Sequence, residues 1–292
     1  MDDQRRSSGM GRGRILWLAS YPKSGNTWLR MFLANLRADG DSPVRINALG
    51  TSPMAAGRDL FVDATGLESS ELTPQETRRL RPLVYAWLSS RANAIVQCKI
   101  HDALVVGDQL IIEPDATFGA VYIVRNPLDV AVSFADHMAM SIDAMIERME
   151  SDEFRIGGRG RPQLQQHLGS WSGHVSSWVD ATSIPVLTVR YEDMMASPFE
   201  TFAGVAAFAN LPADEARIRR AIDFSSFAEA RRQEDSGGFV ERLPGSTLFF
   251  RRGQVGGWRQ DLTAEQAARI VARHSAVMER LGYLDAKGQL TC

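Results

Sequence analysis

The residues whose types and spacing suggest chemistry begin in a short polar segment near the start of the chain. An apolar run at 15–18 is followed by Ser-Tyr-Pro-Lys-Ser-Gly at 20–25 and then by an amphipathic helical pattern. A strand, a tight loop and a helix in this order direct the unpaired N–H groups of the helix start toward one anion. Lys23 would add a positive charge, and Ser24 and Thr27 would add hydroxyl donors. The segment therefore predicts a phosphate-binding loop.

This loop differs in spacing from a Walker A motif, in which the lysine follows the second glycine and a hydroxyl ligates magnesium. Here Lys23 precedes Gly25, which is the only glycine of the segment. The loop is therefore expected to be shorter, with Lys23 reaching in from the strand side. On this segment alone, an ordinary turn of the same composition stays open.

A second candidate pair follows another apolar run, at 121–124. Arg125 stands at its end, and Ser133 stands about two turns into a helix that Pro127 would begin. A guanidinium presents a planar fork of donors to an anion, so an arginine and a serine make a phosphate clamp. The alternative is that Arg125 pairs with Asp129 across the helix start.

A third segment, at 249–258, reads Phe-Phe-Arg-Arg-Gly-Gln-Val-Gly-Gly-Trp. The adjacent Arg251 and Arg252 suit a highly charged anion, and Gly253 lets the backbone approach a ligand closely. A surface loop around a buried Trp258 is the alternative.

Lys99 and His101 stand near the end of a predicted strand, where alternation sends both side chains to the same side. An imidazole with a pKa of about 6.5 suits a general base, and Lys99 beside it could stabilise negative charge as a bond breaks. A surface histidine at a strand end is the alternative, and His137 is a second candidate for the base. The remaining histidines fall in helical patterns and are interpreted as structural: His167, His174 and His274.

Short β-branched runs alternate with helical patterns, which is typical of an α/β fold with a central parallel β-sheet flanked by helices. Strands are predicted at 15–19, 94–99, 120–124 and 186–191, a mobile loop at 150–163, and the main helices at 25–38, 74–91, 127–139, 164–179, 198–210, 213–222 and 264–281. Ligands of such sheets bind beyond the carboxyl ends of the strands. The residues expected on one rim of the sheet are Lys23, His101, Arg125 and Tyr191.

Composition restricts the class of protein. The 292 residues are 44% hydrophobic and 23% charged, as in a globular protein with a core, and a net charge of −2 argues against nucleic-acid binding. Two cysteines provide neither a disulfide framework nor a metal-binding pair. With no signal peptide and no apolar stretch of about 18 residues, we expect a cytoplasmic protein without a membrane partner. The arginine clusters at 78–81 and 217–220 are expected on solvated helix faces.

Taken together, the motifs resemble those of the sulfotransferases that use 3′-phosphoadenosine 5′-phosphosulfate (PAPS). The segment 21–28 matches the family's Y-P-K-S-G-T-T-W loop except at Asn26, where an amide replaces a hydroxyl. Residues 251–258 match R-K-G-x-x-G-x-W with Arg252 in place of lysine, and residues 99–101 match K-T-H. The arginine and serine eight residues apart complete the set, and the motifs follow the family's order along most of the chain.

The resemblance implies a single-domain, P-loop-kinase-like sulfotransferase fold over residues 14–292, after a disordered tail at 1–13. No metal is expected, because side chains supply the positive charge. The implied catalytic residues are His101, as general base, with Lys23, Lys99 and Ser133. The implied cofactor-binding residues are Lys23, Ser24, Gly25, Asn26, Thr27, Trp28, Arg125, Ser133, Tyr191, Ser225, Phe227, Arg251, Arg252 and Gly253.

The implied reaction is in-line transfer of a sulfuryl group from PAPS to a hydroxyl of a small-molecule or natural-product acceptor, which leaves adenosine 3′,5′-bisphosphate (PAP). The chain looks more like the soluble bacterial members of the family, and secondary metabolism is the expected setting. The acceptor stays open among a small natural product, a glycopeptide, a phenol, a lipid and a sugar. Its pocket is expected in the loop-like segments 40–70, 140–163 and 228–250. Because the dimerisation motif of the animal members is not evident, the subunit arrangement stays open and includes a homodimer.

Two other functions compete with this interpretation. A P-loop nucleotide-dependent phosphotransferase requires a Walker lysine and a magnesium-binding hydroxyl in register, and the sequence has neither. A non-catalytic nucleotide-binding or scaffolding protein of the same fold would not need an intact Lys23 and His101. A single-turnover assay with labelled cofactor would distinguish that protein from an enzyme.

Overall fold

The computed structural model describes residues 12–51, 53–212, 214–242 and 248–291, with the backbone alone for Gly50 and Thr51. Of the predicted tail at 1–13, residues 1–11 lie outside the described residues. Gly13 is buried, and its N–H donates to the carbonyl of Thr117 (3.2 Å).

The chain divides into two compact units, each built from three segments of sequence. Unit 1 comprises residues 1–21, 52–122 and 151–188, and unit 2 comprises residues 22–51, 123–150 and 189–292. The strands are β1 (Ile15–Ser20), β2 (Val96–Ile100), β3 (Val105–Val106), β4 (Gln109–Leu110), β5 (Thr117–Val124), β6 (Arg155–Ile156), β7 (Gln166–His167) and β8 (Val186–Arg190). The α-helices are α2 (Asn26–Ala38), α3 (Arg58–Thr65), α4 (Pro74–Arg91), α5 (Pro127–His137), α6 (Ile142–Glu150), α7 (Trp171–Val179), α8 (Tyr191–Ala196), α9 (Pro198–Phe208), α10 (Glu215–Phe224), α11 (Phe227–Gly237) and α12 (Ala264–Arg280).

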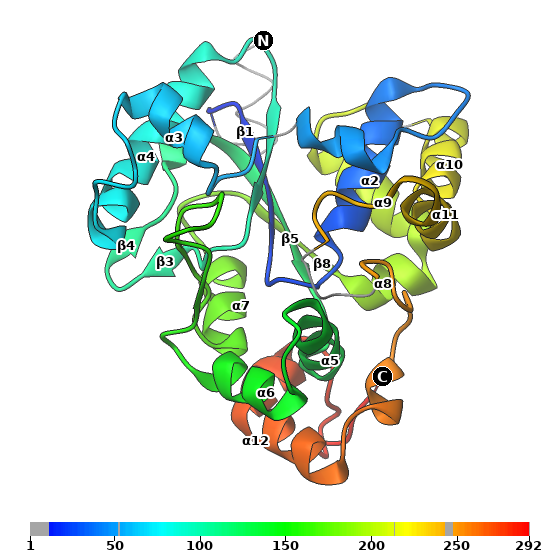
Figure 1. The fold of residues 1–292 in the computed structure, drawn as a ribbon. Coiled ribbons are helices and arrows are strands. Elements are labelled where there is room, and N and C mark those ends of the chain that lie inside the picture. The colour runs from blue at the N-terminus through cyan, green and yellow to red at the C-terminus, as the bar shows by residue number, and fades with distance from the viewer. Residues whose placement is uncertain (1–11, 52, 213, 243–247, 292) are drawn as a thin grey trace. The chain divides into compact units, whose positions relative to one another are not determined.

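A parallel sheet with the strand order β2-β1-β5-β8 forms the centre of unit 1, and only the last residues of β5 and β8 belong to unit 2 (Figure 1). β1 and β2 pair from Ile15 opposite Val96 to Ala19 opposite Ile100. Every residue of β1 and β5 is buried, as expected of strands covered on both faces. Cys98 of β2 lies opposite Trp17 of β1 and is also buried. The predicted central parallel sheet flanked by helices is confirmed.

Helix α4 of unit 1 shows why one predicted solvated arginine is buried. Thr73 and Glu76 form a capping box at its start, as the sequence suggested for Thr73. Arg81 falls on the buried face of the helix, one turn before Tyr85, and its side chain is only 2% exposed. The Asp102 carboxylate compensates its charge through two hydrogen bonds of 2.9 and 2.6 Å. The expectation that Arg81 is solvated is therefore wrong.

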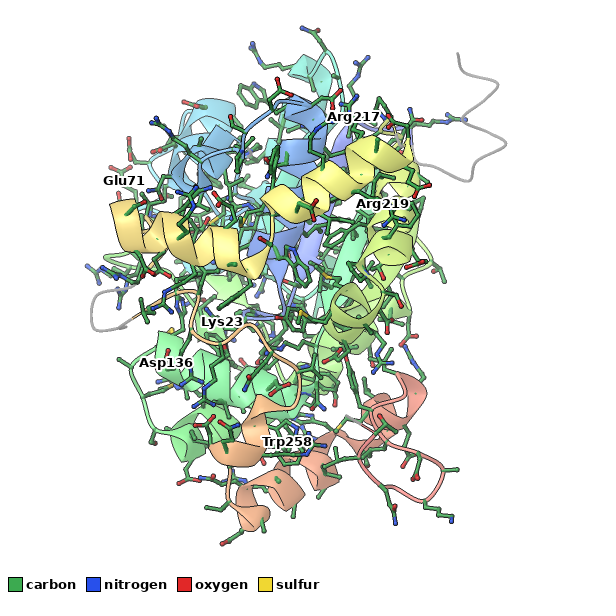
Figure 2. All side chains as sticks on the ribbon, turned by 90° about the vertical axis from the view of Figure 1, so that its right-hand side faces the viewer. Lys23, Glu71, Asp136, Arg217, Arg219 and Trp258 are labelled. Atoms are coloured by element: carbon green, nitrogen blue, oxygen red, sulfur yellow. The ribbon has the colours of Figure 1, made fainter. Side chains whose placement is uncertain are left out.

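Helix α10 of unit 2 contradicts the same expectation for Arg217. Its guanidinium donates to the carbonyl of Leu36 (2.8 and 2.6 Å) and lies 3.3 Å from the Asp39 carboxylate, so it satisfies a carbonyl in the last turn of α2. Arg217 and Arg219 project from α10 in Figure 2. Three other helices of this unit also contact one another, namely α5, α6 and α12 (Figure 1).

One helix start and several predicted loops differ from the sequence prediction or gain detail in the structure. The helix predicted at 164–179 begins only at Trp171, because Ser170 caps it and the preceding residues pair β7 with β6. The segments expected to be loop-like near the acceptor each contain a helix, namely α3, α6 and α11. Within the predicted mobile loop at 150–163, Arg58 of α3 donates to the carbonyls of Arg161 (2.9 Å) and Gly158 (2.9 Å).

Candidate active site

The loop that the sequence predicts to bind phosphate runs from Pro22 to Gly25 at the start of unit 2. α2 begins at the next residue, Asn26, so the loop leads directly into a helix N-terminus. Gly25 has φ +107°, and a Cβ at this position would lie 2.7 Å from Cδ2 of Tyr191. Only glycine fits here without displacing the tyrosine ring. The loop backbone is thus shaped to present the first N–H groups of α2 to an anion.

Ser24 supplies the strongest sign that this loop binds a ligand. Its side chain is 0% exposed, and its Oγ has no hydrogen-bond partner among the residues that the structure describes. A buried hydroxyl without a partner is costly and uncommon. Asn26 and Thr27 are also buried in the first turn of α2. A phosphate oxygen would satisfy the Ser24 hydroxyl, so the loop fits a phosphorylated cofactor.

Lys23 carries the positive charge of the loop. Its backbone is left-handed (φ +68°), and its ammonium lies 3.9 Å from the centre of the Phe249 ring. The His137 ring also contacts Phe249 edge-on, with centroids 5.8 Å apart. Phe249 therefore contacts both Lys23 and the second candidate for the base.

Arg125 links the phosphate-binding loop to the 249–258 segment, which we term the arginine loop. It donates to the carbonyl of Lys23 (3.1 Å) and to that of Gln254 (3.0 Å), and its guanidinium lies 4.3 Å from the centre of the Tyr191 ring. The alternative pairing of Arg125 with Asp129 is therefore wrong. Arg125 instead fixes two backbone segments that are far apart in the sequence.

Two buried carboxylates hold the arginine loop by its backbone. Asp129 of α5 accepts from the N–H groups of Gly256 (2.8 Å) and Trp258 (2.9 Å). Glu234 of α11 accepts from the N–H groups of the first two loop residues, at 2.7 and 2.9 Å. Hydrogen bonds to an ionised carboxylate are about twice as strong as neutral ones, so both ends of the loop are fixed. In Figure 2 this loop runs between the labelled Lys23 and Trp258.

The arginines of the loop remain reachable by solvent. Arg251 lies 3.7 Å from the Asp136 carboxylate, and Arg252 pairs with the carboxylate of Asp261. Gly253 has φ +59°, and a Cβ there would lie 2.2 Å from the ring of Phe227. The loop backbone thus lies directly against that ring.

The remaining predicted nucleotide-binding residues fall in the same unit. Trp28 lies edge-on to Tyr191, with centroids 5.9 Å apart, and burial raises the pKa of the Tyr191 phenol. Ser225 is buried and donates to the carbonyl of Ile222 at the end of α10. Ser133 is half-buried in α5, and its role stays a prediction.

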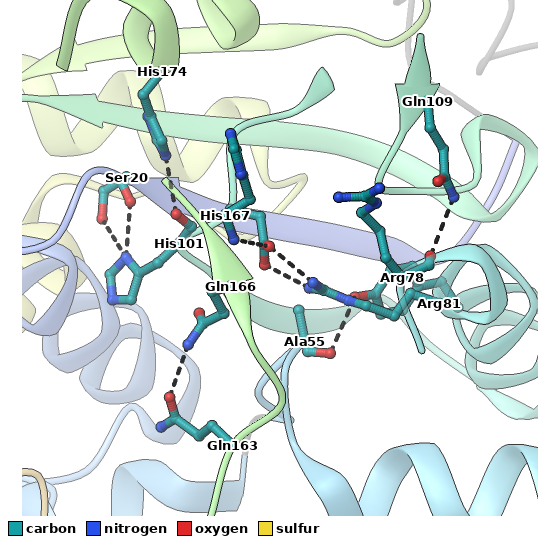
Figure 3. Close-up of polar contacts among 12 residues, drawn as sticks. Ser20, Ala55, Arg78, Arg81, His101, Gln109, Gln163, Gln166, His167 and His174 are labelled. Carbon is teal, nitrogen blue, oxygen red and sulfur yellow. Dashed lines mark hydrogen bonds and ion pairs between the residues drawn. The ribbon is translucent and has the colours of Figure 1, made fainter. Parts of the chain in front are cut away.

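His101 and Lys99 belong to unit 1, at the carboxyl end of β2. Nδ1 of His101 lies 2.8 Å from the carbonyl oxygen of Ser20 and 3.3 Å from its hydroxyl (Figure 3). A carbonyl only accepts hydrogen bonds, so Nδ1 carries the proton in this contact, and in the neutral ring Nε2 is then the acceptor nitrogen. Lys99 is buried, and its backbone pairs with the segment of Pro53 and Ala55. This tautomer suits a base that acts through Nε2.

The structure therefore brings together Lys23, Arg125 and Tyr191 in unit 2, as predicted from the sheet rule. Whether His101 and Lys99 face the phosphate-binding loop stays a prediction. Sequence reasoning missed the supporting carboxylates Asp129 and Glu234, whose partners are backbone N–H groups that no motif marks. Among the described residues, no three histidine, cysteine or acidic side chains gather as metal ligands.

A family model for the sulfotransferase domain matches residues 14–282, which covers most of both units. The chain belongs to the sulfotransferase family. The predicted enzyme class, a PAPS-dependent sulfotransferase, is thereby confirmed, as is a fold built on one sulfotransferase domain. No helix in the described ranges is long and apolar enough to cross a membrane.

Two relatives are similar to this chain along most of their length. Sulfotransferase 1A1 of Canis lupus familiaris is 26% identical over 287 residues, with 91% of this chain and 84% of that protein covered. Cytosolic sulfotransferase 16 of Arabidopsis thaliana is 24% identical over 282 residues, with 87% and 72% covered.

Solved structures show the same fold. Retinol dehydratase in complex with retinol and PAP superposes with a TM-score of 0.62 at 20% identity, with 93% of this chain and 83% of that chain covered. A mouse sulfotransferase, SULT7A1, complexed with PAP gives a TM-score of 0.60 at 19% identity, with 92% and 84% covered. The predicted P-loop-kinase-like architecture is therefore confirmed.

Proposed function

We propose that this sulfotransferase transfers a sulfuryl group from PAPS to a hydroxyl of a small-molecule acceptor and releases PAP. The buried, unpartnered hydroxyl of Ser24 carries the proposal, because it lies in a loop that leads into a helix N-terminus and also holds Lys23. The presence of PAP in the solved structures of similar proteins supports the choice of nucleotide.

Different residues of unit 2 would bind the 5′-phosphosulfate, the 3′-phosphate and the adenosine of the nucleotide. Lys23, Ser24 and the first N–H groups of α2 would bind the 5′-phosphosulfate, since preorganised positive charge stabilises a transferring group and its leaving oxygen. Arg125 and Arg252 would bind the 3′-phosphate, with the assistance of Ser133 and the Gly253 backbone. The adenosine would lie against Trp28, Tyr191, Ser225 and Phe227. When bound, PAPS supplies the sulfuryl group.

His101 is the proposed general base. Its Nδ1 donates to the Ser20 carbonyl, which leaves Nε2 to accept the proton of the acceptor hydroxyl. Lys99 would stabilise charge beside this base.

The proposed acceptor is an apolar molecule with a hydroxyl group, in keeping with the predicted natural product. Phe239 and Phe250 are buried against one another and belong to the core of unit 2. Phe249 is only partly buried and lies beneath the Lys23 ammonium, so it could contact an acceptor. The solved relatives hold androsterone and retinol. The predicted bacterial origin, cytoplasmic location and homodimer stay predictions.

The first test is turnover of labelled PAPS with a panel of hydroxyl-bearing acceptors. His101→Ala should lower the turnover rate by about 10²–10⁴, the usual contribution of a general base, while the affinity for PAP changes by only a few-fold. His137→Ala is the matched control and should keep most activity. Wild-type turnover in the His101 variant, or its loss only in the His137 variant, would remove His101 from this role.

The second test separates the two phosphates of the nucleotide. Arg125→Ala and Arg252→Ala should weaken binding of PAP much more than binding of adenosine 5′-phosphate in calorimetric titrations. Equal losses for both nucleotides would contradict the 3′-phosphate assignment.

A further inference from the structure

His174 lies at the beginning of α7 in unit 1, and its imidazole is 0% exposed. Aromatic side chains enclose it: the Tyr21 ring lies edge-on at 5.1 Å and the Tyr122 ring lies at 5.8 Å. The sequence interpretation of this histidine as structural rests only on a helical pattern. Its hydrogen bonds point to a more specific role.

The proton positions on His174 follow from its two partners. Nε2 lies 3.0 Å from the carbonyl oxygen of His101, so Nε2 carries a proton and donates it (Figure 3). Nδ1 lies 3.0 Å from the hydroxyl of Tyr122 and is then the acceptor of the Tyr122 proton. The hydrogen bonds therefore run in one direction, from the Tyr122 hydroxyl through the His174 ring to the His101 backbone.

Burial keeps this direction fixed over the working pH range. It lowers the pKa of His174 to about 3, so the ring stays neutral. It also raises the pKa of Tyr122 well above its ordinary value, so the phenol keeps its proton. Neither group changes its donor and acceptor roles near neutral pH.

The backbone that follows His101 is held as firmly as the carbonyl. The Asp102 carboxylate binds Arg81 and accepts from the N–H of His167 (2.9 Å), while the Asp102 carbonyl accepts from the indole of Trp178 (3.0 Å). His101 itself is fixed at two points, because Ser20 holds the ring and His174 holds the carbonyl. The direction of Nε2 depends on both.

We infer that His174 is a positioning residue for the base of the sulfuryl transfer: its Nε2–H holds the His101 carbonyl and so sets the direction of the His101 ring. The inference rests on the proposed function to the extent that His101 is the base. The arrangement requires a donor at the end of the His174 side chain, and Tyr122 selects the tautomer that provides one. A merely space-filling histidine would require neither.

Two substitutions separate donation from packing. His174→Gln keeps an N–H donor at about the same distance from the backbone, whereas His174→Phe fills the volume of the ring and donates nothing. We expect the phenylalanine variant to lower kcat by about 100-fold, since a misplacement of about 1 Å can have that effect. The kcat of the glutamine variant should be at least about ten-fold higher than that of the phenylalanine variant. The affinity for PAP should stay within about two-fold in both, because the nucleotide residues lie in unit 2.

A double-mutant cycle tests whether His174 acts through His101. In a His101→Ala background, His174→Phe should cause no further loss of kcat, because the group that it positions is absent. A wild-type kcat in the His174→Phe variant, equal losses in both His174 variants, or a full further loss in the His101→Ala background would overturn the inference.

A measurement without turnover keeps the inference distinguishable from the proposed function. In protein labelled with ¹⁵N-histidine, NMR should show His101 with the proton on Nδ1 in the wild type and in His174→Gln, and a mixture of tautomers in His174→Phe. If His101→Ala retains turnover, the base assignment fails, and this spectrum still tests the inference. An unchanged His101 tautomer in His174→Phe would overturn the inference.

If the His174→Phe variant does not fold, Tyr122→Phe serves in its place. It removes one hydroxyl and should lower kcat several-fold, and an unchanged kcat in Tyr122→Phe would also overturn the inference.

Discussion

The cationic residues of unit 2 and the histidine of unit 1 are held by different means. In unit 2 the backbone is fixed: the carboxylates of Asp129 and Glu234 bind the N–H groups of the arginine loop, and the charged ends of its arginines stay in contact with solvent. In unit 1 the side chains are fixed, because the His101 ring bonds to the buried Ser20 and the Asp102 carboxylate bonds to the buried Arg81. One region keeps its charges reachable, and the other keeps its geometry constant.

This difference matches what binding and chemistry require. A site for a multiply charged nucleotide needs cations that a ligand can reach and a backbone that keeps them nearby. A general base needs one orientation, since its contribution depends on the distance and angle to the proton. Substitutions in unit 2 should therefore mainly change affinity, and substitutions in unit 1 should mainly change stability and turnover.

The largest effect is expected from the buried ion pair of unit 1. Arg81→Met leaves the Asp102 carboxylate buried without its partner, which typically costs about 3–5 kcal/mol of the free energy of unfolding. The matched control is Arg79→Met on the exposed face of the same helix, which should change stability by less than about 0.5 kcal/mol. Urea denaturation checks both, and similar effects of the two changes would contradict the role given to the buried ion pair of unit 1.

The next largest effect is expected in the phosphate-binding loop, where two glycine variants distinguish a steric clash with a neighbouring ring from backbone strain alone. Gly25→Ala adds a Cβ 2.7 Å from the Tyr191 ring at a left-handed residue, so we expect PAP affinity to fall by about 30-fold or more. Gly66→Ala is the control, because Gly66 is also left-handed (φ +69°) but has nothing within 4 Å of an added Cβ. The control should lose about 1 kcal/mol of stability and no PAP affinity. Calorimetry on both variants measures the difference.

A pH effect of intermediate size follows from the burial of His174. Burial lowers its pKa from 6.5 to about 3, so below pH 6.5 the unfolded chain binds a proton that the folded protein excludes. Stability should therefore be fully present above pH 6.5 and fall as the pH drops toward 3, by about 2 kcal/mol at pH 5. His174→Gln should remove this loss. Equal acid sensitivity of the wild type and the variant in urea denaturation at pH 7 and pH 5 would contradict the assignment.

The smallest effect tests the carboxylate support of the arginine loop. Asp129→Asn replaces an ionised acceptor of two backbone N–H groups by a neutral one, and PAP affinity should fall by about five- to ten-fold, or about 1 kcal/mol. Asp261→Asn is the matched control: it removes the carboxylate that pairs with Arg252, so affinity should stay equal or rise. Titration with PAP compares the two, and losses of the same size would contradict the proposed support.

The parts of the molecule that are continuous in sequence could be predicted from it. The loop after the first strand, the parallel sheet and the convergence of Lys23 and Arg125 followed from local patterns and one rule for the ends of strands. Arg81 could not be placed, because its burial depends on a carboxylate 21 residues away in sequence that lies opposite only after folding. The role of His174 was hidden for the same reason. A helical pattern shows on which face of the helix a side chain lies, and it does not show to which carbonyl that side chain donates a hydrogen bond.

The buried thiol of Cys98 offers a way to follow one unit by itself. It is the middle residue of β2, the outer strand of the sheet of unit 1, and burial raises its pKa above the ordinary value, so the folded protein should resist alkylating reagents at this residue. Reaction at Cys98 then requires β2, or the side chains that cover it, to move away. The rate of its modification, read by mass spectrometry of the peptide that contains it, reports how often that sheet opens while the nucleotide region is saturated with ligand.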